Sequence, residues 1–171
     1  MEKVILVVVL FICLFTDIKS RKILNIVTLP TIFTGLIYHI IINGNKGLLF
    51  SGKGFLVGLG LLIIPYLLGG MGAGDVKLMA AIGALMGPSF VFYSFIYTAL
   101  IGGVIALLLI FKTRGFINTI KSFFFNLTNL VFFRSNLGSM IIPKDKKSSI
   151  SFPYGVAIVL GTLSTLIWGG F

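Results

Sequence analysis

The sequence predicts an all-α, polytopic membrane protein, and two observations carry this prediction. Of the 171 residues, 57% are hydrophobic and 11% are charged, with a mean hydropathy of +1.12, whereas a soluble domain carries about a quarter charged residues. In addition, apolar runs of nearly membrane-spanning length recur along the chain with no long soluble segment between them. We therefore expect residues 1–171 to form a single membrane-embedded domain.

Six transmembrane helices are expected in this domain. Their predicted ranges are residues 3–18, 26–42, 54–70, 76–87, 89–111 and 150–170. The first resembles a signal peptide, but no small-residue cleavage site follows it, so we interpret it as a retained span. The fourth is short, because twelve helical residues rise only about 18 Å against a hydrocarbon core of about 30 Å. The alternative is one broken helix from Val76 to Phe111, interrupted at Gly87, Pro88 and Ser89.

The basic residues distinguish these alternatives. With six spans, eleven of the fourteen Lys and Arg residues fall on one side of the membrane and three on the other. If the fourth and fifth spans are merged, four basic residues fall on one side of the membrane and ten on the other. The first and the last basic loops then lie on opposite sides. Because basic loops stay in the cytoplasm, we expect six spans, both termini outside and a cytoplasmic loop over residues 112–149. This topology also explains the net charge of +10 without a nucleic-acid partner.

The cytoplasmic loop carries the pattern of an amphipathic helix between the fifth and sixth spans. Over residues 116–131, apolar side chains recur on one helical face, and asparagine, lysine and serine side chains lie opposite. Such a helix lies at a membrane surface. Two interpretations stay open: a cover for the helix bundle, or a docking element for a substrate.

Two further features are interpreted as packing devices. The pairs Gly54 and Gly58, and Gly83 and Gly87, have the GxxxG spacing that lets helices approach closely. His39, the single histidine, falls in the middle of the second span, and we interpret it as a packed polar residue rather than a catalyst. The sequence shows no Ser-His-Asp set, nucleotide-binding loop or metal-ligand cluster, so neither a metal nor a cofactor is expected.

Two of the four acidic residues occupy predicted helix ends. Asp17 closes the first span and Asp75 opens the fourth, so the topology places both at the cytoplasmic boundary. Each alone is compatible with a helix-capping role. A carboxylate at the centre of a membrane helix costs about 3 kcal/mol, less near the interface, and acids retained there usually mark chemistry or ion passage. Two carboxylates brought together share a proton and can activate a water against an amide carbonyl.

The helix ends also suggest an asymmetry within this pair. Asp75 begins a helix, where the macrodipole favours an anion, and Asp17 ends one, where it does not. The sequence hypothesis is therefore that Asp75 acts as the base and Asp17 carries the shared proton.

Three sequence blocks resemble the type IV prepilin peptidases, which are GxGD membrane aspartic proteases related in motif to the preflagellin peptidases. "GAGDVKLMAAIGALMG" is similar to the GxGD segment, "TDIKSRKILNIVTLP" to the first aspartate block, and "FPYGVAIVLG" to the C-terminal Pro-(Phe/Tyr)-Gly block. One departure is Leu24, which stands where the family usually has proline. The paired CxxC motifs of the larger members, which also methylate their product, have no counterpart here.

The resemblance implies a site and a function. It makes Asp17 and Asp75 catalytic, assigns Gly72 and Gly74 to a loop that a substrate strand approaches closely, and suggests Lys77, Asn25 and Pro153 as supporting residues. The implied activity is cleavage of the short basic leader of a prepilin, pseudopilin or preflagellin at the cytoplasmic face of a prokaryotic inner membrane, without methyltransferase activity. The alternatives are an ion-coupled transporter that uses both acids as a relay, and a noncatalytic component of a pilus or secretion machine. The oligomeric state stays open.

Overall fold

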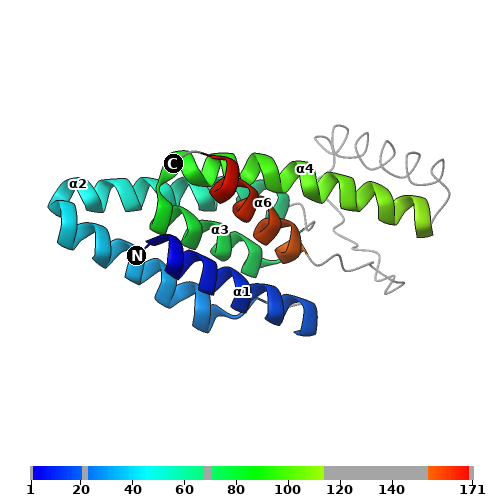
Figure 1. Ribbon diagram of the computed structural model, residues 1–171, viewed down its shortest axis with the longest axis horizontal. Helices are drawn as coiled ribbons and strands as arrows, with labels where there is room; N and C mark the ends of the chain where they lie inside the picture. The colour runs from blue at the N-terminus through cyan, green and yellow to red at the C-terminus, as the bar shows by residue number, and fades with distance from the viewer. Residues whose placement is uncertain (1, 21–22, 68–70, 114–153, 170–171) are drawn as a thin grey trace, which may run out of the picture. The chain divides into compact units, whose positions relative to one another are not determined.

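The computed structural model describes residues 2–20, 23–67, 71–113 and 154–169, and every element in these ranges is a helix. The all-helical prediction is thus confirmed for the described residues. The helices are α1 (Glu2–Ser20), α2 (Asn25–Leu67), α3 (Ala73–Met86), α4 (Pro88–Thr113) and α6 (Tyr154–Trp168) (Figure 1). The predicted amphipathic helix over residues 116–131 lies outside the described residues.

The chain divides into two compact units. The first comprises Met1–Gly102 together with Pro153–Phe171, and the second comprises Gly103–Phe152. Of the second unit, the described part is the last portion of α4. All contacts discussed below lie within the first unit.

Helix α2 consists of two arms that meet at Gly44. This glycine has φ 55° and ψ −134°, a conformation that costs glycine little because it has no Cβ. Figure 1 shows the two arms diverging from this turn. The predicted second and third spans lie on the two arms, but the loop expected between residues 42 and 54 is wrong, since helix resumes directly after Gly44. The helix continues here because the two arms pack against each other. A Cβ added at Gly47 would overlap the backbone carbonyl of His39, so the arms are in close contact beside the turn.

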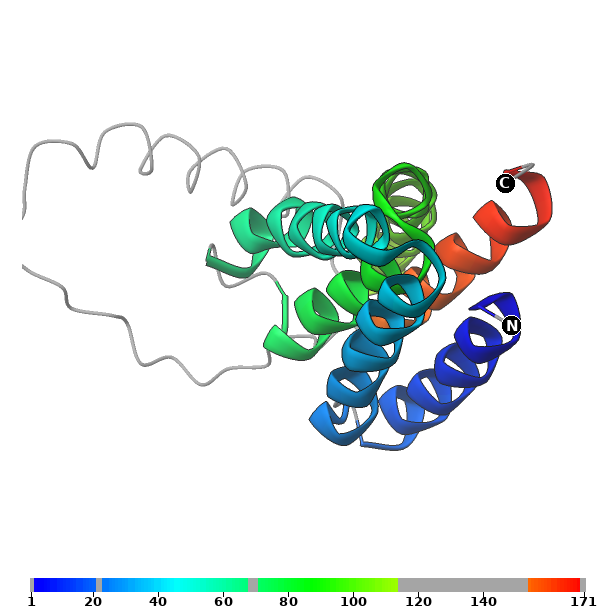
Figure 2. The same cartoon turned by 90° about the vertical axis from the view of Figure 1, so that its left-hand side faces the viewer.

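Helix α3 lies against both arms of α2 and forms the centre of this unit (Figure 2). Almost every residue from Asp75 to Leu85 is buried. The second arm contacts α3 backbone to backbone, because a Cβ added at Gly54 would overlap the Gly83 carbonyl and one added at Gly83 would overlap that of Gly54. The packing interpretation is therefore confirmed for Gly54 and Gly83, one glycine from each GxxxG motif.

Side chains of α2 satisfy the buried C-terminal end of α3. The last carbonyls of a helix have no partner within it, and in an apolar environment each unsatisfied group is costly. His39 Nε2 donates to the Leu85 carbonyl at 2.9 Å, and Ser51 Oγ donates to the Ala84 carbonyl at 2.6 Å. The interpretation of His39 as a packed polar residue agrees with this contact. These bonds let a short helix end inside the bundle.

Helices α3 and α4 are separate helices joined at Gly87. Gly87 has φ 86°, and its N–H donates to the Gly83 carbonyl at 2.8 Å, which closes α3. Pro88 then occupies the first position of α4, where proline is well tolerated. In Figure 1, the chain reverses its direction between α3 and the start of α4. The single broken helix over 76–111 is thus not adopted, and α3 begins at Ala73, three residues before the predicted start.

The outer faces of the helices are strongly apolar. Phe11 and Phe15 of α1 and Trp168 of α6 have 59%, 67% and 80% of their surface exposed. Two helices, Asn25–Leu67 and Pro88–Leu108, are long and apolar enough to cross a membrane. Large exposed apolar side chains on a helical bundle indicate a lipid-facing exterior. The core itself includes side chains of α1, α3 and α6, among them Leu10, Leu78, Met79 and Ile158.

Candidate active site

Asp17 lies near the C-terminal end of α1 and is only 5% exposed. Its carboxylate rests against the first turn of α6, where the backbone amides of Gly155 and Val156 hydrogen-bond with it. One oxygen, Oδ2, has no hydrogen-bond partner among the described residues. A buried carboxylate oxygen without a partner is costly in a purely structural role. Asp17 is therefore not explained by capping α1.

Asp75 lies in the first turn of α3 and is 9% exposed. The helix is capped at Gly72, whose N–H donates to Asp75 Oδ2 at 3.2 Å, while the Asp75 N–H donates to the Gly72 carbonyl at 3.1 Å. The capping role considered from the sequence is thus present, but with Gly72 as the N-cap and Asp75 as the third residue of the helix. This arrangement holds the carboxylate at the N-terminal end of α3.

The structure brings the two aspartates together. Helices α1, α3 and α6 contact one another, and the Asp17 and Asp75 carboxylates lie within range of a direct electrostatic interaction. Tyr154, the first residue of α6, lies within the same range of Asp75. Since neighbouring buried carboxylates share a proton, this arrangement supplies a base and an acid in one place. Sequence reasoning assigned no role to Tyr154 or Gly155, although both belong to the Pro-Tyr-Gly block.

The two loop glycines differ in what surrounds them. A Cβ added at Gly74 would lie 2.9 Å from Ile23 Cβ, so the space beside this glycine is filled by the chain that follows α1. A Cβ added at Gly72 would lie 3.3 Å from Asp75 Oδ2. Gly74 is therefore explained by internal packing, and the approach of a substrate strand stays a prediction for Gly72.

Of the three suggested supporting residues, the structure joins two. Lys77 Nζ donates to Asn25 Oδ1 at 3.0 Å, which connects the N-terminal part of α3 to the start of α2. The contact is exposed, so its contribution to stability is small. Pro153 lies outside the described residues. The described residues contain no group of three or more His, Cys, Asp or Glu side chains that could hold a metal ion.

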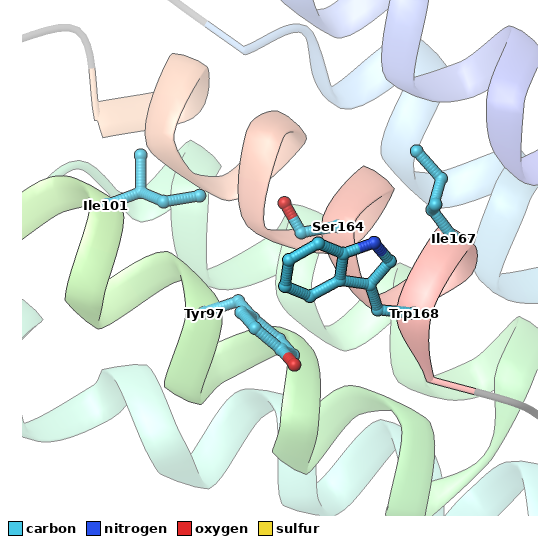
Figure 3. Close-up of a pocket in the computed structure, with 5 residues that line it drawn as sticks. All are labelled: Tyr97, Ile101, Ser164, Ile167 and Trp168. Atoms are coloured by element: carbon cyan, nitrogen blue, oxygen red, sulfur yellow. The ribbon is translucent and has the colours of Figure 1, made fainter.

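Of two cavities in the bundle, one lies next to Asp75 and the other lies far from Asp17. A groove of about 400 Å³ lies between the arms of α2 and α3, with apolar walls and Lys77 in its lining; Val76 and Lys77 of this groove directly follow Asp75. A second cavity of about 260 Å³ lies between α4 and the end of α6, lined by Tyr97, Ser164 and Trp168 among others (Figure 3). Ser164 is roughly 13 Å along α6 from Gly155, so this cavity is remote from Asp17.

The fold and the site thus define a helical membrane protein with two buried aspartates where helix ends meet. The model of the type IV leader peptidase family matches residues 4–107, a range that contains both aspartates and more than half of the chain. The protein belongs to the type IV leader peptidase family, which confirms the resemblance seen in the sequence. No curated protein and no solved structure gives a significant match.

Proposed function

We propose that the protein is an aspartic endopeptidase that removes the short basic leader from prepilin-like precursors at the cytoplasmic face of a prokaryotic inner membrane. The observation that carries this proposal is the pair Asp17 and Asp75, both buried and within electrostatic range of each other at the ends of α1 and α3. The family supports a leader peptidase. The apolar helices support a reaction at the membrane.

The two carboxyl groups are sufficient for peptide hydrolysis. The ionised carboxylate takes a proton from a water molecule, whose oxygen attacks the scissile carbonyl carbon, and the protonated carboxyl gives its proton to the carbonyl oxygen. As the C–N bond of the tetrahedral intermediate breaks, the first carboxyl returns its proton to the leaving amine. One hydroxyl of the intermediate reprotonates the second carboxylate. The pair ends in its starting state, with one water added across the amide bond.

Replacing either aspartate tests this mechanism. Asp17→Asn and Asp75→Asn each remove a proton-transfer group, so we expect cleavage of a purified prepilin in detergent to fall by at least about 100-fold. Glu2→Gln is the matched control, because Glu2 opens α1, roughly 22 Å along the helix from Asp17. All three variants should insert into the membrane and purify like the wild type. Cleavage at the wild-type rate by either asparagine variant would remove that residue from the mechanism.

The same experiment separates the two alternatives. An ion-coupled transporter would leave the prepilin intact and carry protons when reconstituted in vesicles, with flux lost in the asparagine variants. A noncatalytic assembly component would show neither cleavage nor flux.

A further inference from the structure

Gly155 lies where a side chain would collide with Asp17. A Cβ added at Gly155 would be 2.6 Å from Asp17 Oδ2 and 2.9 Å from Cγ, distances that real Cβ contacts essentially never show. Gly155 is the second residue of α6 and is itself buried. The carboxylate can therefore lie against the backbone of α6 only because this position carries no side chain.

The same turn of α6 presents backbone amides to the carboxylate. The Gly155 and Val156 amides hydrogen-bond with Asp17, and the N-terminus of a helix favours an anion through its dipole. For Asp17, the sequence hypothesis took account only of α1, at whose C-terminal end an anion is disfavoured. The N-terminal turn of α6 opposes that effect, so the helix ends alone no longer assign the shared proton to Asp17.

We propose that Gly155 is a positioning residue, through which the first turn of α6 holds the Asp17 carboxylate in place and stabilises the ionised form of the aspartate pair. The proposal rests on the peptidase function proposed above and names a further part of the same site. Among the described residues, the titratable groups that interact with Asp17 are Cys13 on its own helix and Asp75 on α3, and Tyr154 on α6 interacts in turn with Asp75. Because Asp17 and Asp75 titrate as a unit, the consequence concerns the pair as a whole.

The test is Gly155→Ala, assayed by prepilin cleavage over a range of pH. The methyl group displaces the carboxylate, so we expect kcat to fall by about 10- to 100-fold, while KM changes little because Gly155 touches Asp17 rather than the substrate. The acid limb of the pH profile should move to higher pH, since the deprotonated pair loses its amide donors and binds a proton more readily. Gly161→Ala is the matched control on the same helix, α6: its Cβ would overlap Thr98 of α4, away from Asp17, so it should lower stability without moving the pH profile.

A second variant removes one of the two amides directly. Val156→Pro replaces one donor N–H in the first turn of α6, where proline is tolerated, with the ring Cδ, and it leaves Gly155 without a side chain. It should also move the acid limb to higher pH. The proposal is overturned if both variants keep the wild-type pH profile, or if Gly161→Ala shifts the profile as much as Gly155→Ala does.

An activity-independent measurement distinguishes failure of this proposal from failure of the proposed function. Infrared titration of the protonated carboxyl band should show the band persisting to higher pH in Gly155→Ala, and the additional Asp17→Asn substitution should abolish that difference. A wild-type protein that cleaves no prepilin would refute the peptidase function, and the infrared result would still decide the role of Gly155. An unchanged band would refute the positioning role.

Discussion

At the scale of single residues, the buried polar side chains serve two different purposes. His39 and Ser51 donate to carbonyls at the end of α3 and have their partners within the fold. Asp17 instead retains an oxygen without a hydrogen-bond partner in the described part of the chain. The hydroxyls of Thr28, Ser94 and Thr98 also lack a partner in that part, but a buried carboxylate oxygen in this state is far more costly than a neutral hydroxyl. The histidine is therefore structural and the aspartate is the candidate for chemistry.

Substituting His39 should lower stability without abolishing catalysis. His39→Leu leaves the buried Leu85 carbonyl without its donor, which costs about 1–3 kcal/mol, and the folded fraction should still cleave at the wild-type rate. Unfolding followed in detergent, together with the cleavage rate per folded molecule, measures both effects. His39→Gln keeps a donor and should recover part of the loss. A catalytic defect at unchanged stability would instead place the histidine in the reaction.

Sequence reasoning found the two aspartates but not the glycine that accommodates one of them. The distribution of basic residues predicts a topology, and this topology places Asp17 and Asp75 at the same depth in the membrane. The two acids are conspicuous because acids are rare in this apolar chain. The role of Gly155 depends on contact with a helix from the other end of the chain, which no local pattern shows. The one available signal was a glycine directly after Pro153 and Tyr154 at the start of the last helix.

At the scale of elements, the stability of α3 comes from contacts at its two ends rather than from its own length. Its fourteen residues form a short helix, yet its N-terminus is capped at Gly72 and its last carbonyls accept hydrogen bonds from α2. The sequence predicted the helix three residues too late, since Gly72 and Gly74 resemble a loop, and it missed helix between Gly44 and Gly54 for the same reason. In both places, tertiary contacts override the weak helix propensity of glycine.

A pair of glycine substitutions in α2 tests the backbone contact with α3. Gly54→Ala places a methyl group on the Gly83 carbonyl and should destabilise the protein by about 1–3 kcal/mol. Gly60 lies on the same arm, and a Cβ there meets nothing within 4 Å. Gly60→Ala should therefore be neutral or stabilising by up to about 1 kcal/mol. Equal losses in the two variants, measured by unfolding in detergent, would contradict the contact.

At the scale of the whole molecule, the first arm of α2 relates the site to the membrane. Lys77, two residues after Asp75 on α3, donates a hydrogen bond to Asn25, so the start of this arm lies close to Asp75. From Asn25 to Gly44 the helix rises roughly 28 Å, nearly the thickness of a hydrocarbon core. If the aspartates face the cytoplasm, as the basic loops predict, the Gly44 turn lies at the outer surface.

Single-cysteine labelling tests this orientation. With Cys13 replaced by serine, a cysteine introduced at the exposed Asn45 should react with a membrane-impermeant maleimide added outside intact cells. A cysteine introduced at the exposed Ser20 should react only after permeabilisation. The wild-type protein, whose Cys13 is 1% exposed, should stay unlabelled and serves as the reference. Labelling at Ser20 rather than Asn45 in intact cells would reverse the topology.

The reciprocal contact between Gly54 and Gly83 has a consequence for how a substrate enters. Because backbone lies on backbone at this contact, no side chain there can rotate aside to open a passage between these two helices. A lateral gate on this side would have to separate the helices along their whole contact. We therefore expect the contact between Gly54 and Gly83 to stay closed. A precursor that arrives from the lipid should reach Asp75 along another face of the bundle.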